Sequence, residues 1–130
     1  MSLISYICGM ETTSKKDSDI RELYFSEEFL EFYNTLEDRI KTKFEHTMDI
    51  IRTEYILSTK FVKHLDGTDL YEMRVSVSTN EFRTILFVVD DDNIILSKRI
   101  LLLNGFLKKS TKDYSRQIKI AKRILEDFEL

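Results

Sequence analysis

The chain has 130 residues, of which 42% are hydrophobic and 33% are charged. This length suits one domain rather than two, and the composition is typical of a folded, soluble protein. The chain has no proline, three glycines and one cysteine. These counts exclude a collagen-like chain, a glycine-rich nucleotide loop and an internal disulfide, and no metal site or cofactor is expected.

The first residues are expected to lie outside the fold. Leu3 to Cys8 is mildly apolar but lacks the basic start of a signal peptide, and Gly9 to Asp19 is polar. We therefore expect residues 1–19 to be an N-terminal extension and residues 20–130 to be a single domain. No stretch reaches the ~20 apolar residues that a spanning helix needs, so no membrane partner is expected and the cytoplasm is the expected location.

A short strand and two helices are expected after this extension. Arg21 to Phe25 alternates weakly, as an edge strand does, and Ser26 and Thr35 are each suited to cap a helix. The second helix has apolar residues at steps of three and four, which form one stripe on a helix: Leu36, Ile40, Phe44, Met48, Ile51 and Tyr55.

Three antiparallel strands and a closing helix are expected from the second half of the chain. Leu70 to Val77 alternates in polarity, and Phe82 to Val89 is rich in β-branched and aromatic residues. Ile94 to Leu103 is nearly all apolar, which predicts a central strand, and Ser115 to Phe128 has helical spacing. The expected fold class is α+β: an N-terminal strand and two helices packed on a small antiparallel sheet, with a C-terminal helix.

The charges are distributed unevenly along the chain. The net charge is −3, yet residues 98–123 contain nine basic residues and one acidic residue. Residues 11–38 contain nine acidic residues and three basic ones. The sequence therefore predicts one basic surface that attracts phosphate groups, although a merely solvated helix face would leave the same pattern.

Two arginines are predicted to share one face of the sheet. A loop of two or four residues centred on Thr79-Asn80 places Arg74 and Arg83 as diagonal neighbours. Such a pair can bind one phosphate through forked hydrogen bonds. The alternative is that each arginine pairs with a carboxylate such as Glu72 or Glu81.

Further basic residues stand near predicted strand ends. Lys108 and Lys109 follow the last strand, where side chains on a rigid base are often catalytic or simply solvated. His64 precedes a predicted turn and is the one histidine in a plausible surface position.

At these positions the chain resembles the RelE/HigB-type toxins of bacterial toxin–antitoxin systems, in the phage-derived HigB-like branch of the RelE/ParE superfamily. The resemblance runs from about Asp19 to Phe128. Three stretches carry it: Phe61 to Gly67 followed by Leu70 to Arg74; Phe82-Arg83 with Leu86-Phe87; and Leu103 to Lys112 followed by Ile118 to Ala121 and Arg123.

The resemblance implies a ribosome-dependent endoribonuclease that cuts translated mRNA without a metal, using the 2′-hydroxyl of the RNA as nucleophile. By this resemblance the catalytic residues are Arg74, Arg83, Lys108 and Lys109. RNA contacts are then expected from Lys63, His64, Lys112, Arg116, Lys119 and Arg123. The implied partners are the ribosome, mRNA and a cognate antitoxin with a helix-turn-helix domain.

Two other functions fit the same fold. One is a non-cleaving module that binds RNA or a protein partner. The other is a ParE-like inhibitor of DNA gyrase, which the retained arginines and lysines make less favourable than the nuclease.

Overall fold

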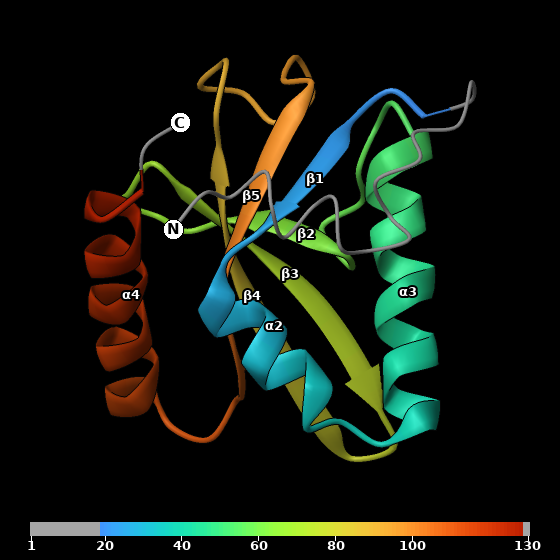
Figure 1. Cartoon of the computed structure of the whole chain (residues 1–130), viewed down its shortest axis with the longest axis vertical. Helices are drawn as coiled ribbons and strands as arrows, with labels where there is room; N and C mark the ends of the chain where they lie inside the picture. The colour runs from blue at the N-terminus through green and yellow to red at the C-terminus, as the bar shows by residue number, and fades with distance from the viewer. Residues whose placement is uncertain (1–18, 129–130) are drawn as a thin grey trace.

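The computed structural model describes residues 19–128 and shows an α+β fold, as expected, with a sheet of five strands (Figure 1). The strand order across the sheet is β1-β5-β4-β3-β2. In chain order the elements are β1 (Glu22–Phe25), α2 (Glu27–Asn34), α3 (Asp38–Thr53), β2 (Val62–His64), β3 (Leu70–Val77), β4 (Asn80–Val88), β5 (Arg99–Leu107) and α4 (Thr111–Glu126). The segment 1–18 of the expected extension lies outside the described residues. Within residues 19–128, no helix is both long and apolar enough to cross a membrane.

The sheet is mixed, which corrects the expectation of a purely antiparallel one. β1 pairs in parallel with β5, whereas all other neighbouring strands are antiparallel. β2 was not expected, because three residues are too few to show a clear alternation. β5 is an interior strand between β1 and β4 rather than the central strand, which is β4, and it starts at Arg99 rather than Ile94. The reason is that the Asp90 carboxylate accepts hydrogen bonds from the Ser97 hydroxyl and the Lys98 N–H, which holds this segment as a loop.

Helices cover both faces of the sheet (Figure 1). α2 and α3 pack on one face through a core that includes Phe29, Phe44 and Met48, and α4 packs on the other through Ala121 and Ile124. Ser26 caps α2 as predicted, since its Oγ accepts a hydrogen bond from the N–H of Phe29.

Three helix boundaries differ from the expectation. Thr35 ends α2 rather than starting α3, whose N-cap is Glu37. α3 ends at Thr53, so Tyr55 lies beyond the helix and is 59% exposed instead of continuing the buried stripe. α4 starts four residues before the predicted Ser115, because the Ser110 side chain accepts a hydrogen bond from the N–H of Asp113 and so caps the helix earlier.

An irregularity in β5 sets the place of α4. Ile85 pairs with Asn104, but the next residue of β4 pairs with Leu102, so Leu103 is an extra residue in the strand. Buried Asn104 then donates hydrogen bonds from Nδ2 to the backbone oxygen of Gln117 at 3.1 Å and to its side-chain oxygen at 2.9 Å. Gly105 leaves room on the opposite face for the ring of Phe32, which a Cβ would approach to 2.3 Å. The bulge thus ties the middle of α4 to β5.

Arg21, just before β1, joins the C-terminal end of α3 to the loop before β5. Its side chain is buried and donates hydrogen bonds to five backbone carbonyls. Two of them, at Ile51 and Glu54, belong to the C-terminal end of α3, where the helix dipole is negative. Two others, at Ile94 and Ile95, belong to the loop before β5. Burial lowers the pKa of Arg21, and the surrounding carbonyl dipoles compensate for the loss of water around its charge.

Arg21→Met is expected to lower the free energy of unfolding by at least about 3 kcal/mol, because five carbonyls lose their donor, two of them in buried hydrogen bonds and three in part-buried ones. Urea unfolding followed by circular dichroism measures this loss. The control is Arg39→Met, since Arg39 is exposed and pairs with Glu37 at 3.5 Å on the surface; its effect is expected to stay below about 1 kcal/mol. Equal effects of the two substitutions would contradict this role for Arg21.

Candidate functional site

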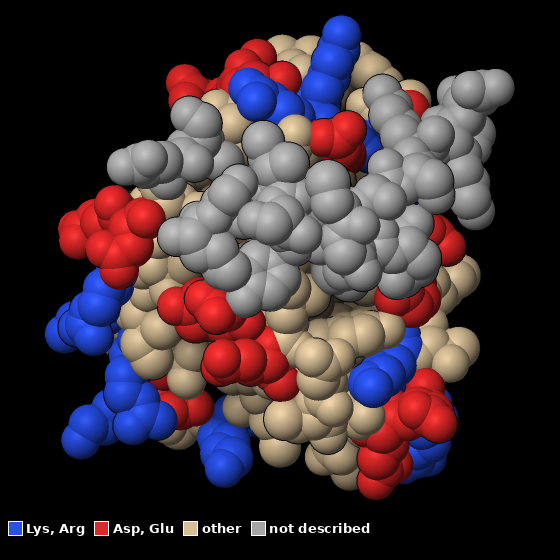
Figure 2. All heavy atoms as spheres, in the orientation of Figure 1, with Lys and Arg blue, Asp and Glu red and all other residues tan. Residues whose placement is uncertain are grey.

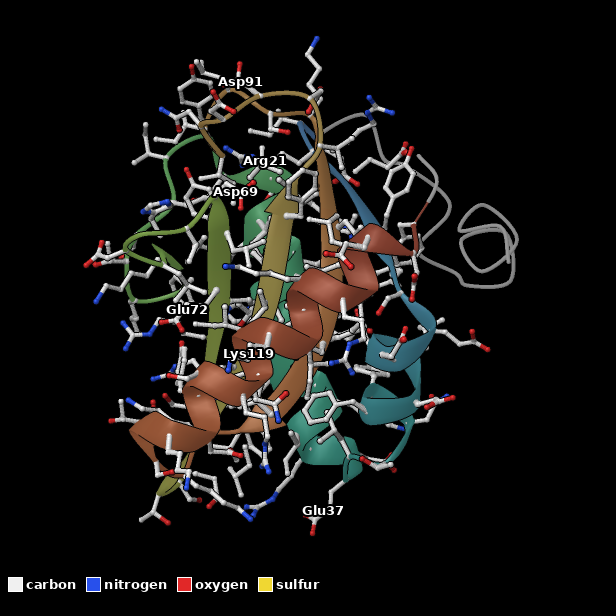
Figure 3. All side chains as sticks on the ribbon, turned by 90° about the vertical axis from the view of Figure 1, so that its left-hand side faces the viewer. Arg21, Glu37, Asp69, Glu72, Asp91 and Lys119 are labelled. Carbon is white, nitrogen blue, oxygen red and sulfur yellow. The ribbon has the colours of Figure 1, made fainter. Side chains whose placement is uncertain are left out.

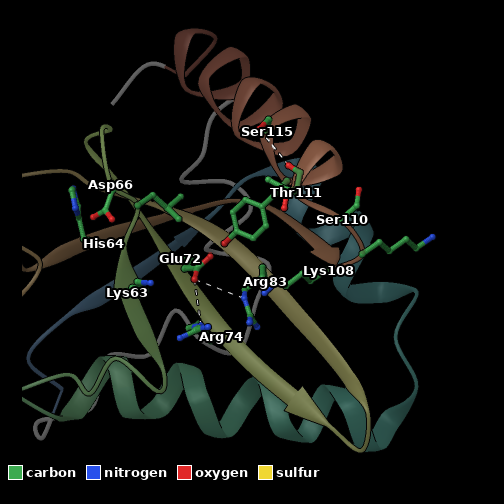
Figure 4. Close-up of a pocket in the computed structure, with 13 residues that line it drawn as sticks. Lys63, His64, Asp66, Glu72, Arg74, Arg83, Lys108, Ser110, Thr111 and Ser115 are labelled. Carbon is green, nitrogen blue, oxygen red and sulfur yellow. Dashed lines mark hydrogen bonds and ion pairs between the residues drawn. The ribbon is translucent and has the colours of Figure 1, made fainter.

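A pocket of about 470 Å³ lies on the face of the sheet that α4 partly covers (Figure 4). We call it the basic pocket. β2, β3 and β4 supply its floor, and the end of β5 and the start of α4 supply one wall. Its lining residues are Lys63, His64, Leu65, Asp66, Glu72, Arg74, Arg83, Lys108, Lys109, Ser110, Thr111, Tyr114 and Ser115. Six of the ten predicted site residues therefore come together here.

The β3–β4 hairpin places the two arginines on this face. Arg74 lies directly opposite Arg83, so the arginines share a face as predicted but are not diagonal neighbours. The turn is one residue earlier than expected, at Ser78-Thr79, and Ser78 has a positive φ of 56°. Two-residue hairpin turns commonly require this left-handed conformation because it matches the twist of the strands. The loop still has an even number of residues, so Arg74 and Arg83 stay on the same face of the sheet.

The carboxylate of Glu72 lies between the two arginines. Its Oε2 is 3.3 Å from Nε of Arg74 and 3.8 Å from Nε of Arg83, as the dashed lines in Figure 4 mark. Nη2 of Arg83 is also 3.4 Å from Oε1 of Glu81. Both arginines thus pair with carboxylates, which is the alternative that the sequence left open, while they also line one pocket.

The two arginines differ in how far a ligand can reach them. The side chain of Arg74 is 30% exposed, whereas that of Arg83 is 3% exposed. Arg74 donates a hydrogen bond to the carbonyl of Thr59 at 3.2 Å, and Arg83 donates one to the carbonyl of Phe82 at 3.0 Å. Arg74 is therefore the arginine that a bound phosphate can contact, and Arg83 supports Glu72 from within the sheet.

Burial dominates the electrostatics of Glu72. Desolvation raises the pKa of this carboxyl above its ordinary value of 4.5, and Arg83, Arg74, Lys63 and Lys108 lower it by less. Oε1 of Glu72 and Nε of Arg83 are buried without a hydrogen-bond partner among the described residues. Packing therefore holds Glu72, Arg74 and Arg83 together, although the desolvation of Glu72 costs electrostatic free energy.

The remaining predicted residues of the pocket lie near its two ends. Lys63 and His64 come from β2 at one end, and Lys108 lies at the other (Figure 4). Lys108 and Lys109 are both exposed and follow β5 directly. Nε2 of His64 is 2.7 Å from the carbonyl oxygen of Thr68, and its ring lies edge-on to Tyr71.

A second hollow continues from the basic pocket along the first half of α4. We call it the α4 groove, and it is lined by Lys109, Ser110, Lys112, Asp113, Ser115, Arg116 and Lys119. Three more predicted residues, Lys112, Arg116 and Lys119, lie here, and Arg116 pairs with Asp113. Arg123 is exposed further along α4 and lines neither hollow. Figure 2 shows Lys and Arg side chains gathered along the edge of the molecule where the first half of α4 lies.

Seven of the thirteen pocket residues were not predicted as site residues, and Glu72 and Tyr114 are two of them. Glu72 had a visible signal, because it shares the strand face of Arg74 two residues away. Tyr114 lies in the first turn of α4, with its ring edge-on to Phe106 at 5.4 Å. No signal in the sequence pointed to it, because α4 was expected to start after it.

The arrangement is suited to binding anions. The pocket combines five lysines and arginines with the N-terminus of α4, whose free N–H groups and dipole also favour a phosphate. Among residues 19–128, no three His, Cys, Asp or Glu side chains lie close enough together to bind a metal ion.

The raised pKa of Glu72 predicts a pH dependence of stability. Between 4.5, its ordinary value, and its higher folded value, the folded chain binds more protons at Glu72 than the unfolded chain does. The stability of the wild type relative to Glu72→Gln is therefore expected to fall as the pH rises from 4.5 toward the raised folded pKa of Glu72. Urea unfolding at a series of pH values measures the difference. An exposed control, Glu31→Gln, is expected to show no such trend, and a flat difference for Glu72→Gln would contradict the assignment.

Comparison with known proteins supports the RelE-type part of the resemblance noted in the sequence. The chain is similar to the E. coli toxin RelE, solved as a double arginine mutant in the free state, with a TM-score of 0.54 and 14% sequence identity. The match covers 78% of this chain and 96% of that one, and it shows that the two share a fold. No curated protein sequence matches the chain significantly. Residues 31–126 match the family model described as "Phage derived protein Gp49-like (DUF891)". The chain therefore belongs to the Gp49-like family of phage-derived proteins.

Proposed function

We propose that this protein is the toxin of a type II toxin–antitoxin system and an endoribonuclease that cuts translated mRNA on the ribosome. The observation that carries the proposal is the basic pocket, which gathers Lys63, Arg74, Arg83, Lys108 and Lys109 from four separate strands or strand ends. The RelE fold and the resemblance of the sequence to the HigB-like branch support it.

The chemistry requires no metal in this proposal. The 2′-hydroxyl of the RNA gives up its proton to a base and attacks the adjacent phosphorus, so that a 2′,3′-cyclic phosphate forms as the bond from phosphorus to the 5′-oxygen of the next nucleotide breaks. The leaving 5′-oxygen takes up one proton from an acid, so no proton is gained or lost overall. The protein must hold the attacking oxygen in line and stabilise the charge that develops on the phosphate. Arg74 is the reachable guanidinium for that charge, and Lys108 and Lys109 supply a second cation and a group for proton transfer.

Glu72 and Arg83 act as positioning residues in this scheme. Glu72 lies 3.3 Å from Arg74 and is nearly buried, so it restricts the rotamers of Arg74 before RNA binds. Arg83 partly balances the charge of Glu72 from the buried side. A guanidinium that is oriented in advance loses less conformational entropy when it binds the phosphate.

The outer basic residues bind RNA on either side of the reacting phosphate. Lys63 and His64 contact the strand at one end of the pocket, and Lys112, Arg116 and Lys119 contact it along α4. Arg123 contributes through long-range attraction, because it lies beyond the α4 groove. A cognate antitoxin with a helix-turn-helix domain would silence the toxin by covering this basic surface.

One observation favours a second function, a non-cleaving module that binds RNA or a protein partner. Both arginines of the pocket are already paired with Glu72 and Glu81 in the free chain. If RNA does not displace these pairs, the pocket binds a phosphate without stabilising its transition state.

Induced expression of the wild type is expected to arrest growth and to produce cuts in a translated reporter mRNA, mapped by primer extension. Arg74→Ala and Lys108→Ala are each expected to reduce cleavage by about 100-fold or more, because each removes a cation from the developing charge. Arg74→Lys keeps the charge but not the forked geometry, and an intermediate loss is expected.

The matched control is Lys122→Ala, an exposed lysine of α4 that lines neither the basic pocket nor the α4 groove. It is expected to cleave like the wild type. Ribosome binding with intact mRNA would support the binding module instead. Growth arrest with intact mRNA and inhibited DNA supercoiling would support a gyrase inhibitor.

A further inference from the structure

The charge of the surface changes sign at one end of the basic pocket. A third hollow, which we call the acidic hollow, adjoins the pocket and shares His64 with it. Asp69, Asp90, Asp91 and Asp92 line this hollow, and no lysine or arginine does. All four carboxylates are exposed, and the Ser97 hydroxyl holds the pKa of Asp90 below its ordinary value. The acidic hollow is therefore negative at neutral pH.

The opposite end of the pocket remains positive. There the basic pocket and the α4 groove share Lys109, Ser110 and Ser115, so the two form one continuous path. His64 and Ser110 lie at opposite ends of the pocket (Figure 4). Figure 3 shows the same order over the whole face, with Asp91 and Asp69 toward one end, Glu72 below them and Lys119 further along.

We propose that the site extends a single RNA strand on one side only: from the reacting phosphate the strand follows the first half of α4, whereas on the other side it reaches no further than Lys63 and His64 and leaves the surface there. Each phosphate beyond Lys109 meets Lys112, Arg116 or Lys119, whereas a phosphate beyond His64 would meet four carboxylates. Repulsion between like charges disfavours that extension, and the attraction along α4 favours the other. This inference rests on the proposed function, because it assumes that the pocket holds a phosphate of RNA.

The binding of oligodeoxyuridylates tests the proposal, since they lack the 2′-hydroxyl and stay intact. Fluorescence anisotropy at about 50 mM salt measures affinity for lengths from about two to about twelve nucleotides. For the wild type, affinity is expected to rise with length and then level off once the pocket and the α4 groove are filled. In Lys112→Gln/Arg116→Gln/Lys119→Gln, most of the rise is expected to disappear, while the shortest strands bind nearly as before.

Asp69→Asn/Asp92→Asn is the decisive variant. Neither side chain makes a hydrogen bond among those found in residues 19–128, and the substitutions remove two negative charges from the acidic hollow. We expect about 3- to 10-fold tighter binding of the longest strands and little change for the shortest, because a strand can now continue past His64. The matched control is Glu28→Gln/Glu31→Gln, which removes the same charge from exposed positions on α2, on the other face of the sheet.

Two outcomes would overturn the inference: an equal gain from both double variants, or a gain that does not depend on strand length. The proposed function has a separate readout, which is cleavage of translated mRNA by the wild type. If RNA binds on one side only and mRNA is not cut, the proposed nuclease activity is wrong and the proposed binding path stands. If mRNA is cut and RNA binds equally on both sides, the proposed binding path is wrong and the proposed nuclease activity stands.

Discussion

The site depends on one buried carboxylate. Glu72 lies in the pocket floor with Arg74 and Arg83 on either side of it. Burial disfavours the charge of this carboxylate, and the surrounding cations offset part of that cost. The same contact orients Arg74 toward the pocket and keeps Arg83 inside the sheet. A buried ion-pair cluster of this kind contributes little to stability. It does, however, orient in advance the charges that a bound phosphate would contact.

The scaffold brings this cluster together with residues from distant parts of the chain. β3 and β4 supply the arginines, the end of β5 supplies Lys108 and Lys109, and the start of α4 closes the pocket. The bulge at Leu103 is important because it lets Asn104 bind Gln117 and so sets α4 over the sheet. Asn104 is buried and turned to α4, and it is not among the residues that line the pocket.

The net charge is only −3, but the positive and negative charges lie in separate regions of the surface. The basic pocket and the α4 groove form a positive path, and the acidic hollow next to His64 is negative. Such an arrangement attracts a polyanion to one region while repelling it from the neighbouring one. The positions of the charges on the fold therefore indicate the partner of this protein better than its net charge does.

The sequence by itself determined the elements whose residues repeat at a regular period. The buried stripe of α3 from Ile40 to Ile51 and the alternation of β3 were predicted because a half-buried helix or strand imposes its own period on the chain. The shared face of Arg74 and Arg83 followed from the same alternation and an even loop length. Elements without such a period were missed or misplaced: β2 is too short, and the stretch from Ile94 to Leu96, in the loop before β5, is as apolar as a strand.

Only the tertiary structure decided which partners these residues meet. The direct pairing of Arg74 with Arg83 depends on a turn that sits one residue earlier than expected, and the burial of Glu72 depends on the strands around it. Tyr114 joins the pocket because Ser110 caps α4 early, and Arg123 lies outside the α4 groove although it shares its helix. Periodicity reports which face a side chain is on, because it is a property of neighbouring residues. Distances between segments far apart in the chain are set by packing, which no local pattern records.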